Sequence, residues 1–192
     1  MSEPHAAFAH QTPTPAWPHP TLPHLLRPGL RVVFIGYNPG LESARLGHYY
    51  AHRGNAFWRQ LNASGLVPRD VSFEDDAVLM DLAGIGFTDL CPRPTLRASE
   101  LTPAECAEGA GRLLREIEEN APAAAVFGGK QLYEIFARRT SGAIGEPVAW
   151  GRQPRSLSRG RTAVWVVSSP SGLASKWHGE RLRLLRELAA TV

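Results

Sequence analysis

The sequence predicts an α/β protein with three layers (α/β/α), in which helices cover both faces of a mostly parallel central sheet. Three short apolar runs, at residues 31–36, 123–127 and 163–167, have the length and the β-branched and aromatic content of buried strands. Segments with helical signals follow these runs, and such alternation is typical of parallel sheets. A chain of 192 residues has room for one domain with a sizeable core.

The domain is expected to cover residues 29–192, and residues 1–28 are expected to form a tail. Residues 1–24 are rich in proline and histidine and show little periodicity. This composition favours a segment that is partly disordered or lies over the surface. Trp17 and Leu22 are the side chains expected to anchor it, and the irregular spacing of its histidines argues against a metal site.

Helical signals separate the first two apolar runs. Asn55 is expected to cap a helix that stops at Gly65, and a short helix is expected at 73–82. A short strand at 86–90 follows. The stretch 102–105, Thr-Pro-Ala-Glu, is a capping box with proline at the first helical position, so a helix should run from there to about residue 120.

The second half of the chain repeats the pattern of strand and helix. A helix is expected at 130–139, after the glycine pair that ends the second run. Residues 140–160 are predicted to be a loop-rich insert. A final amphipathic helix is expected at 176–190, with Leu182, Leu185 and Leu188 facing inward.

Composition excludes several classes of protein. No apolar run approaches the length of a membrane span, and the N-terminus lacks the basic and apolar regions of a signal peptide, so a cytoplasmic protein is expected. Cys91 and Cys106 lack the spacing of metal ligands and cannot supply the four thiolates of an iron–sulfur cluster. The net charge of +3 is compatible with binding to nucleic acid without establishing it.

Two of the three runs end in loops of unusual composition. The first is followed by Tyr37-Asn38-Pro39-Gly40, and the third by a Ser-Pro-Ser-Gly-Leu loop within 168–175. The carboxyl ends of parallel strands gather at one rim of the sheet, where ligands bind. Leu173 lies at the tip of the second loop. It either packs on its own protein or is a wedge that enters a stack of bases.

Common cofactor and hydrolase motifs are missing from the sequence. There is no G-x-G-x-x-G after the first strand, no phosphate-binding loop ending in Gly-Lys-Ser/Thr and no H-E-x-x-H. Ser171 lies in Ser-Pro-Ser-Gly rather than in the G-x-S-x-G of esterases. We therefore expect no metal and no cofactor.

Several short motifs follow one another along the chain, at residues 36–41, 51–58, 86–90 with 93–95, 129–131, 150–153 and 170–173. In order and spacing these motifs resemble those of the mismatch-specific uracil-DNA glycosylases, the Mug and thymine-DNA glycosylase branch of the uracil-DNA glycosylase superfamily. The resemblance covers about residues 30–190 and leaves the N-terminal tail outside.

The resemblance implies a role for each matched position. Asn38 would position the water that attacks C1′ of the nucleotide, and Tyr50 would stack on the flipped base. Leu173 would fill the gap that the flipped nucleotide leaves. The resemblance places Tyr37, Gly40 and Leu41 at the edge of the base. It places Ser171 and Gly172 against the widowed base or the phosphates. Ser175 and Lys176 would contact the phosphates.

Two positions depart from the family pattern. Asp89 stands where relatives carry Lys or Asn, and we interpret it as a base that activates the water, which an Asn amide cannot do. The alternative for Asp89 is a surface carboxylate, or one that caps or pairs with Arg93. Ser169 stands where bacterial relatives carry Asn, which puts the preference for the opposite base in question.

The expected function is that of a monofunctional DNA glycosylase in base excision repair. It would excise uracil from double-stranded DNA with U:G or related mismatches, as a monomer, by base flipping and attack of water at C1′. The alternatives are a module of the same fold that binds mismatched or damaged DNA without cutting, and an enzyme that acts on free nucleosides.

Overall fold

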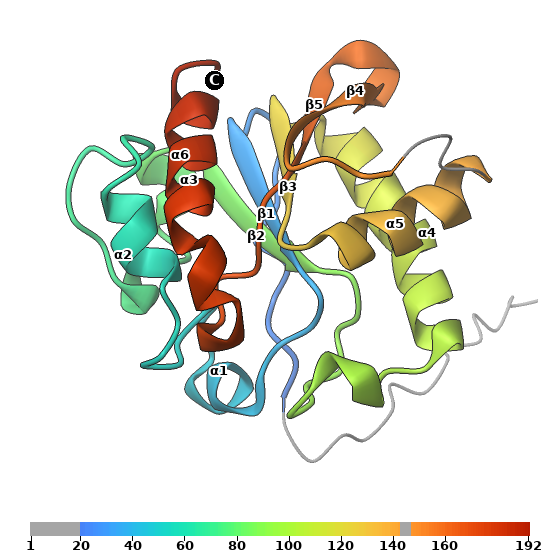
Figure 1. The fold of residues 1–192 in the computed structure, drawn as a ribbon, viewed down its shortest axis with the longest axis horizontal. Helices are drawn as coiled ribbons and strands as arrows, with labels where there is room; N and C mark the ends of the chain where they lie inside the picture. Colours follow the sequence, from blue (N-terminus) through green and yellow to red (C-terminus); the bar gives the residue numbers. More distant parts are fainter. Residues whose placement is uncertain (1–19, 143–146) are drawn as a thin grey trace, which may run out of the picture.

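The central sheet of the protein is sandwiched between helices, as the sequence predicts (Figure 1). The structure, a computed structural model, describes residues 20–142 and 147–192. In this described part, five strands form one sheet in the order β2-β1-β3-β5-β4, parallel except for β4. The strands are β1 (Val32–Gly36), β2 (Ile85–Asp89), β3 (Ala124–Phe127), β4 (Gly151–Leu157) and β5 (Thr162–Val166).

Helices cover both faces of this sheet. The bounds are α1 (Leu41–Leu46), α2 (Phe57–Asn62), α3 (Leu79–Leu82), α4 (Pro103–Asn120), α5 (Lys130–Ser141) and α6 (His178–Ala189). In β1, Val32 and Phe34 pack in a core with residues of α2, α3 and α6, whereas Val33 and Ile35 pack with α4 and α5. The alternation of side chains along a strand thus produces two cores and three layers.

Strand and helix signals in the sequence are confirmed with small shifts in their ends. Thr102 caps α4 as expected, because its side chain accepts from the Glu105 amide and the Glu105 carboxylate accepts from the Thr102 amide. Asn55, the predicted cap, lies one residue before the observed N-cap, Ala56, and its side chain accepts from the amide of Phe57, the first residue of α2. The helix expected at 73–82 is two short turns, Phe73–Asp75 and α3.

The prediction of a loop-rich insert at 140–160 is wrong in one respect. Residues 151–157 form β4, an antiparallel edge strand whose register shifts between Arg152 and Ser156. Pro154 lies in this irregular part, and proline is tolerated in a strand mainly at such edges and bulges. Residues 143–146 of the insert lie outside the described residues.

The predicted tail packs on the domain before residue 29. Leu22, which is expected to anchor it, is buried in the core, and so is Leu25. Leu25 exchanges two backbone hydrogen bonds with Phe87, at 2.9 and 3.0 Å. Gly86 permits this approach, since a Cβ there would lie 2.3 Å from the Leu25 carbonyl oxygen. Trp17 lies outside the described residues.

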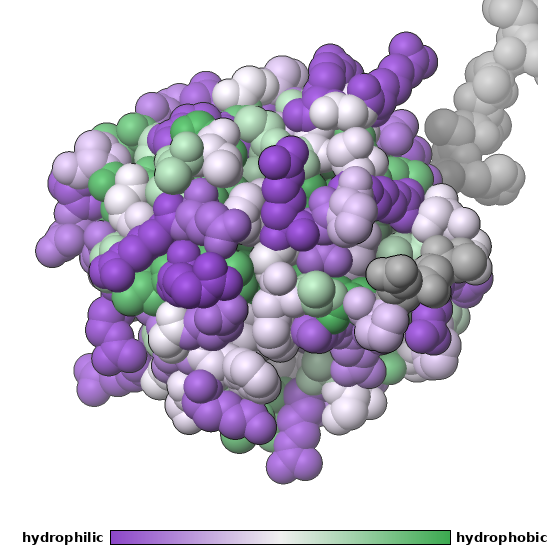
Figure 2. Space-filling model, turned by 45° about the horizontal axis from the view of Figure 1, so that its top comes forward, coloured by the Kyte–Doolittle hydropathy of each residue, from purple (hydrophilic) through white to green (hydrophobic). Residues whose placement is uncertain are grey.

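On the face drawn in Figure 2, with the top of the Figure 1 view turned forward, hydrophilic side chains are interspersed with apolar ones. Among the described helices, none is long and apolar enough to cross a membrane.

Candidate active site

A cavity of about 520 Å³ opens at the carboxyl ends of the parallel strands. Its walls come from the loop after β1, the end of β2, the turn between β3 and α5, and the loop after β5. The rim that the sequence predicts as the binding edge therefore surrounds a real cavity. Six of the proposed site residues line it: Tyr37, Asn38, Gly40, Tyr50, Asp89 and Ser171.

The Asn38 side chain is held by the segment that follows β2. Its Nδ2 lies 2.9 Å from the Arg93 carbonyl oxygen and 2.7 Å from Thr95 Oγ1. The carbonyl can only accept, and the Thr95 hydroxyl donates its own proton to the carbonyl of Arg97, at 2.8 Å. Both partners of Nδ2 are therefore acceptors, which fixes the orientation of the amide.

This orientation leaves Asn38 Oδ1 available. Both protons of the amide are used, and among the described residues no group donates a hydrogen bond to Oδ1. Asn38 itself lines the cavity. Its free oxygen can accept a hydrogen bond from a water or a ligand there.

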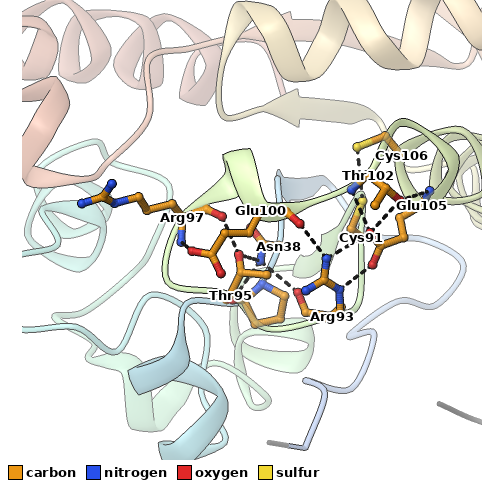
Figure 3. Close-up of polar contacts among 10 residues, drawn as sticks. Asn38, Cys91, Arg93, Thr95, Arg97, Glu100, Thr102, Glu105 and Cys106 are labelled. Atoms are coloured by element: carbon orange, nitrogen blue, oxygen red, sulfur yellow. Dashed lines mark hydrogen bonds and ion pairs between the residues drawn. The ribbon is translucent and has the colours of Figure 1, made fainter. Parts of the chain in front are cut away.

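The segment that holds Asn38 is anchored to α4 in turn (Figure 3). Arg93 forms an ion pair with Glu105, with Nη2 at 3.0 Å from Oε2, and Nη2 also donates to the Glu100 carbonyl. Arg93 lowers the pKa of Glu105 to about 2, so this carboxylate is ionised at neutral pH. The N-terminus of α4 thereby positions Asn38 through Arg93.

Asp89, in contrast, has no hydrogen-bond donor for its carboxylate among the described residues, although only 5% of the residue is exposed. It is neither a surface carboxylate nor the partner of Arg93, which pairs with Glu105. Burial raises the pKa of Asp89 to about 7, against the opposing effect of Arg112. A carboxyl group with this pKa can accept a proton near neutral pH.

Gly36 makes room for Asp89. The two residues are paired in the register of β1 and β2. A Cβ built on Gly36 would lie 2.2 Å from Asp89 Oδ1 and 3.7 Å from the Tyr50 hydroxyl. The absence of a side chain at Gly36 therefore allows the carboxylate and the phenol to occupy the same corner of the cavity.

Tyr50 forms an aromatic wall of the cavity. Its ring stacks on Phe57, with centroids 4.1 Å apart and planes 15° apart. Its backbone is left-handed, with φ of 55°, a conformation that is strained for a residue with a side chain and often found at functional sites. Burial and the nearby Asp89 raise its pKa, so the hydroxyl stays protonated.

The loop after β5 lines the cavity with its first residues and exposes its tip to solvent. Leu173 is fully exposed, so it does not pack on its own protein. It lies in a 3₁₀ segment, Gly172–Trp177, that also contains Ser175 and Lys176. Four residues with predicted DNA contacts therefore do not line the cavity: Gly172, Leu173, Ser175 and Lys176. Leu41, on the first turn of α1, does not line it either.

Sequence reasoning missed an aromatic part of the rim. Trp150 and Trp177 both line the cavity, with ring centroids 5.8 Å apart. The ammonium groups of Lys130 and Lys176 lie 4.7 and 5.5 Å from the ring centroids of Trp150 and Trp177, respectively. Trp150 lies in one of the family-like motifs, but nothing in the sequence paired it with Trp177.

The described residues contain no group of three or more His, Cys, Asp or Glu side chains that could hold a metal ion. His48 and His52 make local contacts instead. His48 lies 3.1 Å from Asp76, and His52 accepts a hydrogen bond from the amide of Gly54.

Comparisons with known proteins agree with the fold and the family. A family model described as "UDG: Uracil DNA glycosylase superfamily" matches residues 23–191. The fold is also similar to a solution NMR structure from Methanosarcina acetivorans, of a protein proposed to be a uracil DNA glycosylase. That likeness has a TM-score of 0.56 at 19% identity and covers 88% of this chain and 98% of the other, so it concerns the fold alone.

Proposed function

The chain belongs to the uracil DNA glycosylase superfamily, and from this premise we propose that it excises uracil from U:G and related mismatches in DNA. Within the superfamily we assign it to the mismatch-specific branch, on its Gly-Tyr-Asn-Pro-Gly and Pro-Ser-Gly-Leu motifs. The observation that carries the proposal is that Asn38 and Asp89 line one cavity, Asn38 with a free oxygen and Asp89 with a carboxylate that no described residue hydrogen-bonds.

The two side chains divide the work on the attacking water. Asn38 Oδ1 accepts a hydrogen bond from the water and orients it toward C1′. Asp89 takes the proton as the water oxygen bonds to C1′, while the bond from C1′ to the base breaks and its electron pair leaves with the base. An amide cannot accept this proton, whereas a carboxylate with a pKa near 7 can.

The flipped base would lie against Tyr50, with Tyr37 and Gly40 at its edge. Tyr50 is supported from behind by Phe57, which suits a stacking surface for a planar ring. Leu41 begins α1 behind this edge, and its contact with the base is a proposal from the family likeness alone.

The exposed loop after β5 is proposed to enter the DNA. Leu173 would take the place of the flipped nucleotide in the stack, since a free apolar side chain at a loop tip can act as a wedge. Ser171 and Gly172 would contact the widowed base or the phosphates, and Ser175 and Lys176 the phosphates. We propose that the protein acts as a monomer, in the cytoplasm.

The test is release of free uracil from a duplex that contains one U:G mismatch. The proposal requires release of uracil without cleavage of the DNA strand. Binding of the duplex without release would identify a damage-binding module of the same fold. Turnover of free deoxyuridine, together with no salt-sensitive affinity for DNA, would identify a nucleoside enzyme.

A further inference from the structure

Arg181, on the buried side of α6, is a charged side chain without a counter-charge. The residue is only 2% exposed. Its Nε donates a hydrogen bond to Gln60 Oε1. Its Nη1 and Nη2 are the buried side-chain nitrogens without a hydrogen-bond partner in the described part of the chain.

The contact with Gln60 does not neutralise the charge. Gln60 Nε2 donates to the His178 carbonyl at 2.9 Å, so its Oε1 faces Arg181 as a neutral acceptor. No described carboxylate lies within ion-pair distance of Arg181. Burial lowers the pKa of Arg181 to about 10, which still leaves the guanidinium charged at neutral pH. A buried unpaired charge destabilises a fold, so its presence calls for a reason.

Arg181 lies directly behind the wall of the active-site cavity. It lines a second cavity of about 10 Å³, which has room for about one water molecule. Tyr50, Gly128, Ser168 and Pro170 line this small cavity and also line the large one. One layer of residues therefore separates the guanidinium from the space proposed for the base.

We propose that Arg181 stabilises the negative charge that develops on the base as it leaves. The charge acts across the shared wall, directly or through one water in the small cavity, and it is fixed in place before the reaction begins. Fixed charges in sites that exclude water stabilise transition states strongly, because no reorganisation is needed. The inference rests on the proposed glycosylase function, since in that reaction the departing base supplies a negative charge.

The leaving group provides the test. Uracil and 5-fluorouracil are placed opposite G in the same duplex, and single-turnover release is measured with enzyme in excess. The fluorine makes the departing anion weaker as a base, so this base needs less help to leave. We expect Arg181→Met to slow release of uracil roughly tenfold, and release of 5-fluorouracil by a clearly smaller factor.

Two variants serve as controls. Arg183→Met removes the same charge from the exposed side of α6 and should slow both substrates equally or not at all. Arg181→Lys keeps the charge and should retain most of the uracil rate. If Arg181→Met does not fold, Arg181→Gln takes its place, because glutamine is neutral but can form hydrogen bonds. This variant must then slow release of uracil more than release of 5-fluorouracil.

Equal losses with both bases would make Arg181 a structural residue and overturn the inference. The melting temperature does not separate the two roles, because Arg181→Met removes a buried charge and also leaves Gln60 Oε1 without its donor. A wild-type protein that releases neither base would overturn the proposed function, and the inference with it.

Discussion

The two loops that enclose the cavity differ in how their tips are held. The loop after β1 is tied to the segment after β2, since the amide of Cys91 donates to the Tyr37 carbonyl and that of Thr95 to the Pro39 carbonyl, at 2.9 and 3.1 Å. Asn38 adds its own hydrogen bonds to the same segment. The loop after β5, in contrast, carries a fully exposed Leu173 and a Trp177 that is 39% exposed.

This difference matches the two tasks that we propose for these loops. Orienting a water requires side chains fixed to within a fraction of an ångström, which hydrogen bonds from neighbouring segments provide. Entering a DNA duplex requires apolar surface that the protein does not bury itself. We therefore expect substitutions in the first region to change chemistry, and substitutions in the second to change the handling of DNA.

The largest effect is expected from Asp89→Asn. Loss of the proposed base should lower single-turnover release of uracil by roughly 10²- to 10⁴-fold. Since the base must be ionised, the wild-type rate should rise with pH and level off above about 7, and the variant should lack this inflection. Asp81→Asn, on the exposed face of α3, is the matched control. An unchanged rate in Asp89→Asn would exclude it as the base.

Leu173→Ala should have the next largest effect, and on duplex DNA above all. The variant lacks three carbon atoms of the wedge, so release of uracil from a U:G duplex should fall roughly tenfold. Release of uracil from single-stranded DNA should fall less, because a nucleotide flipped out of a single strand leaves no gap in a duplex. Leu82→Ala is a control at a leucine that is 37% exposed and does not line the cavity. Equal losses on both DNAs would argue against a wedge.

Thr95→Val should have the smallest effect of the three. Valine keeps the shape of the side chain but removes the acceptor for Asn38 Nδ2, a contribution of about 1 kcal/mol, so kcat should fall roughly fivefold. The affinity for the duplex should not change. Thr140→Val in α5 is the control away from the cavity. A loss of affinity with unchanged kcat would place Thr95 in DNA binding instead.

The sequence signals that succeeded are local ones. The buried runs of β1, β3 and β5 and the capping box at Thr102 depend on neighbours in the chain, and the structure confirms them. The edge strand β4 was missed because Gly, Pro and Arg obscure its alternation, and its pairing with β5 is a contact between segments. Leu25 was assigned to the tail because its partner, Phe87, is distant in sequence.

The residue types of the candidate site could likewise be predicted from the sequence, because an Asn after a buried strand and a carboxylate in Gly-Phe-Thr-Asp-Leu are visible without coordinates. The environment of these two side chains could not be predicted from the sequence. The register of β1 and β2 brings Asp89 to Gly36, where burial raises its pKa, and folding of α6 carries Arg181 behind the cavity wall. Burial and the absence of a counter-charge are properties of packing between distant segments, so tertiary structure alone establishes them.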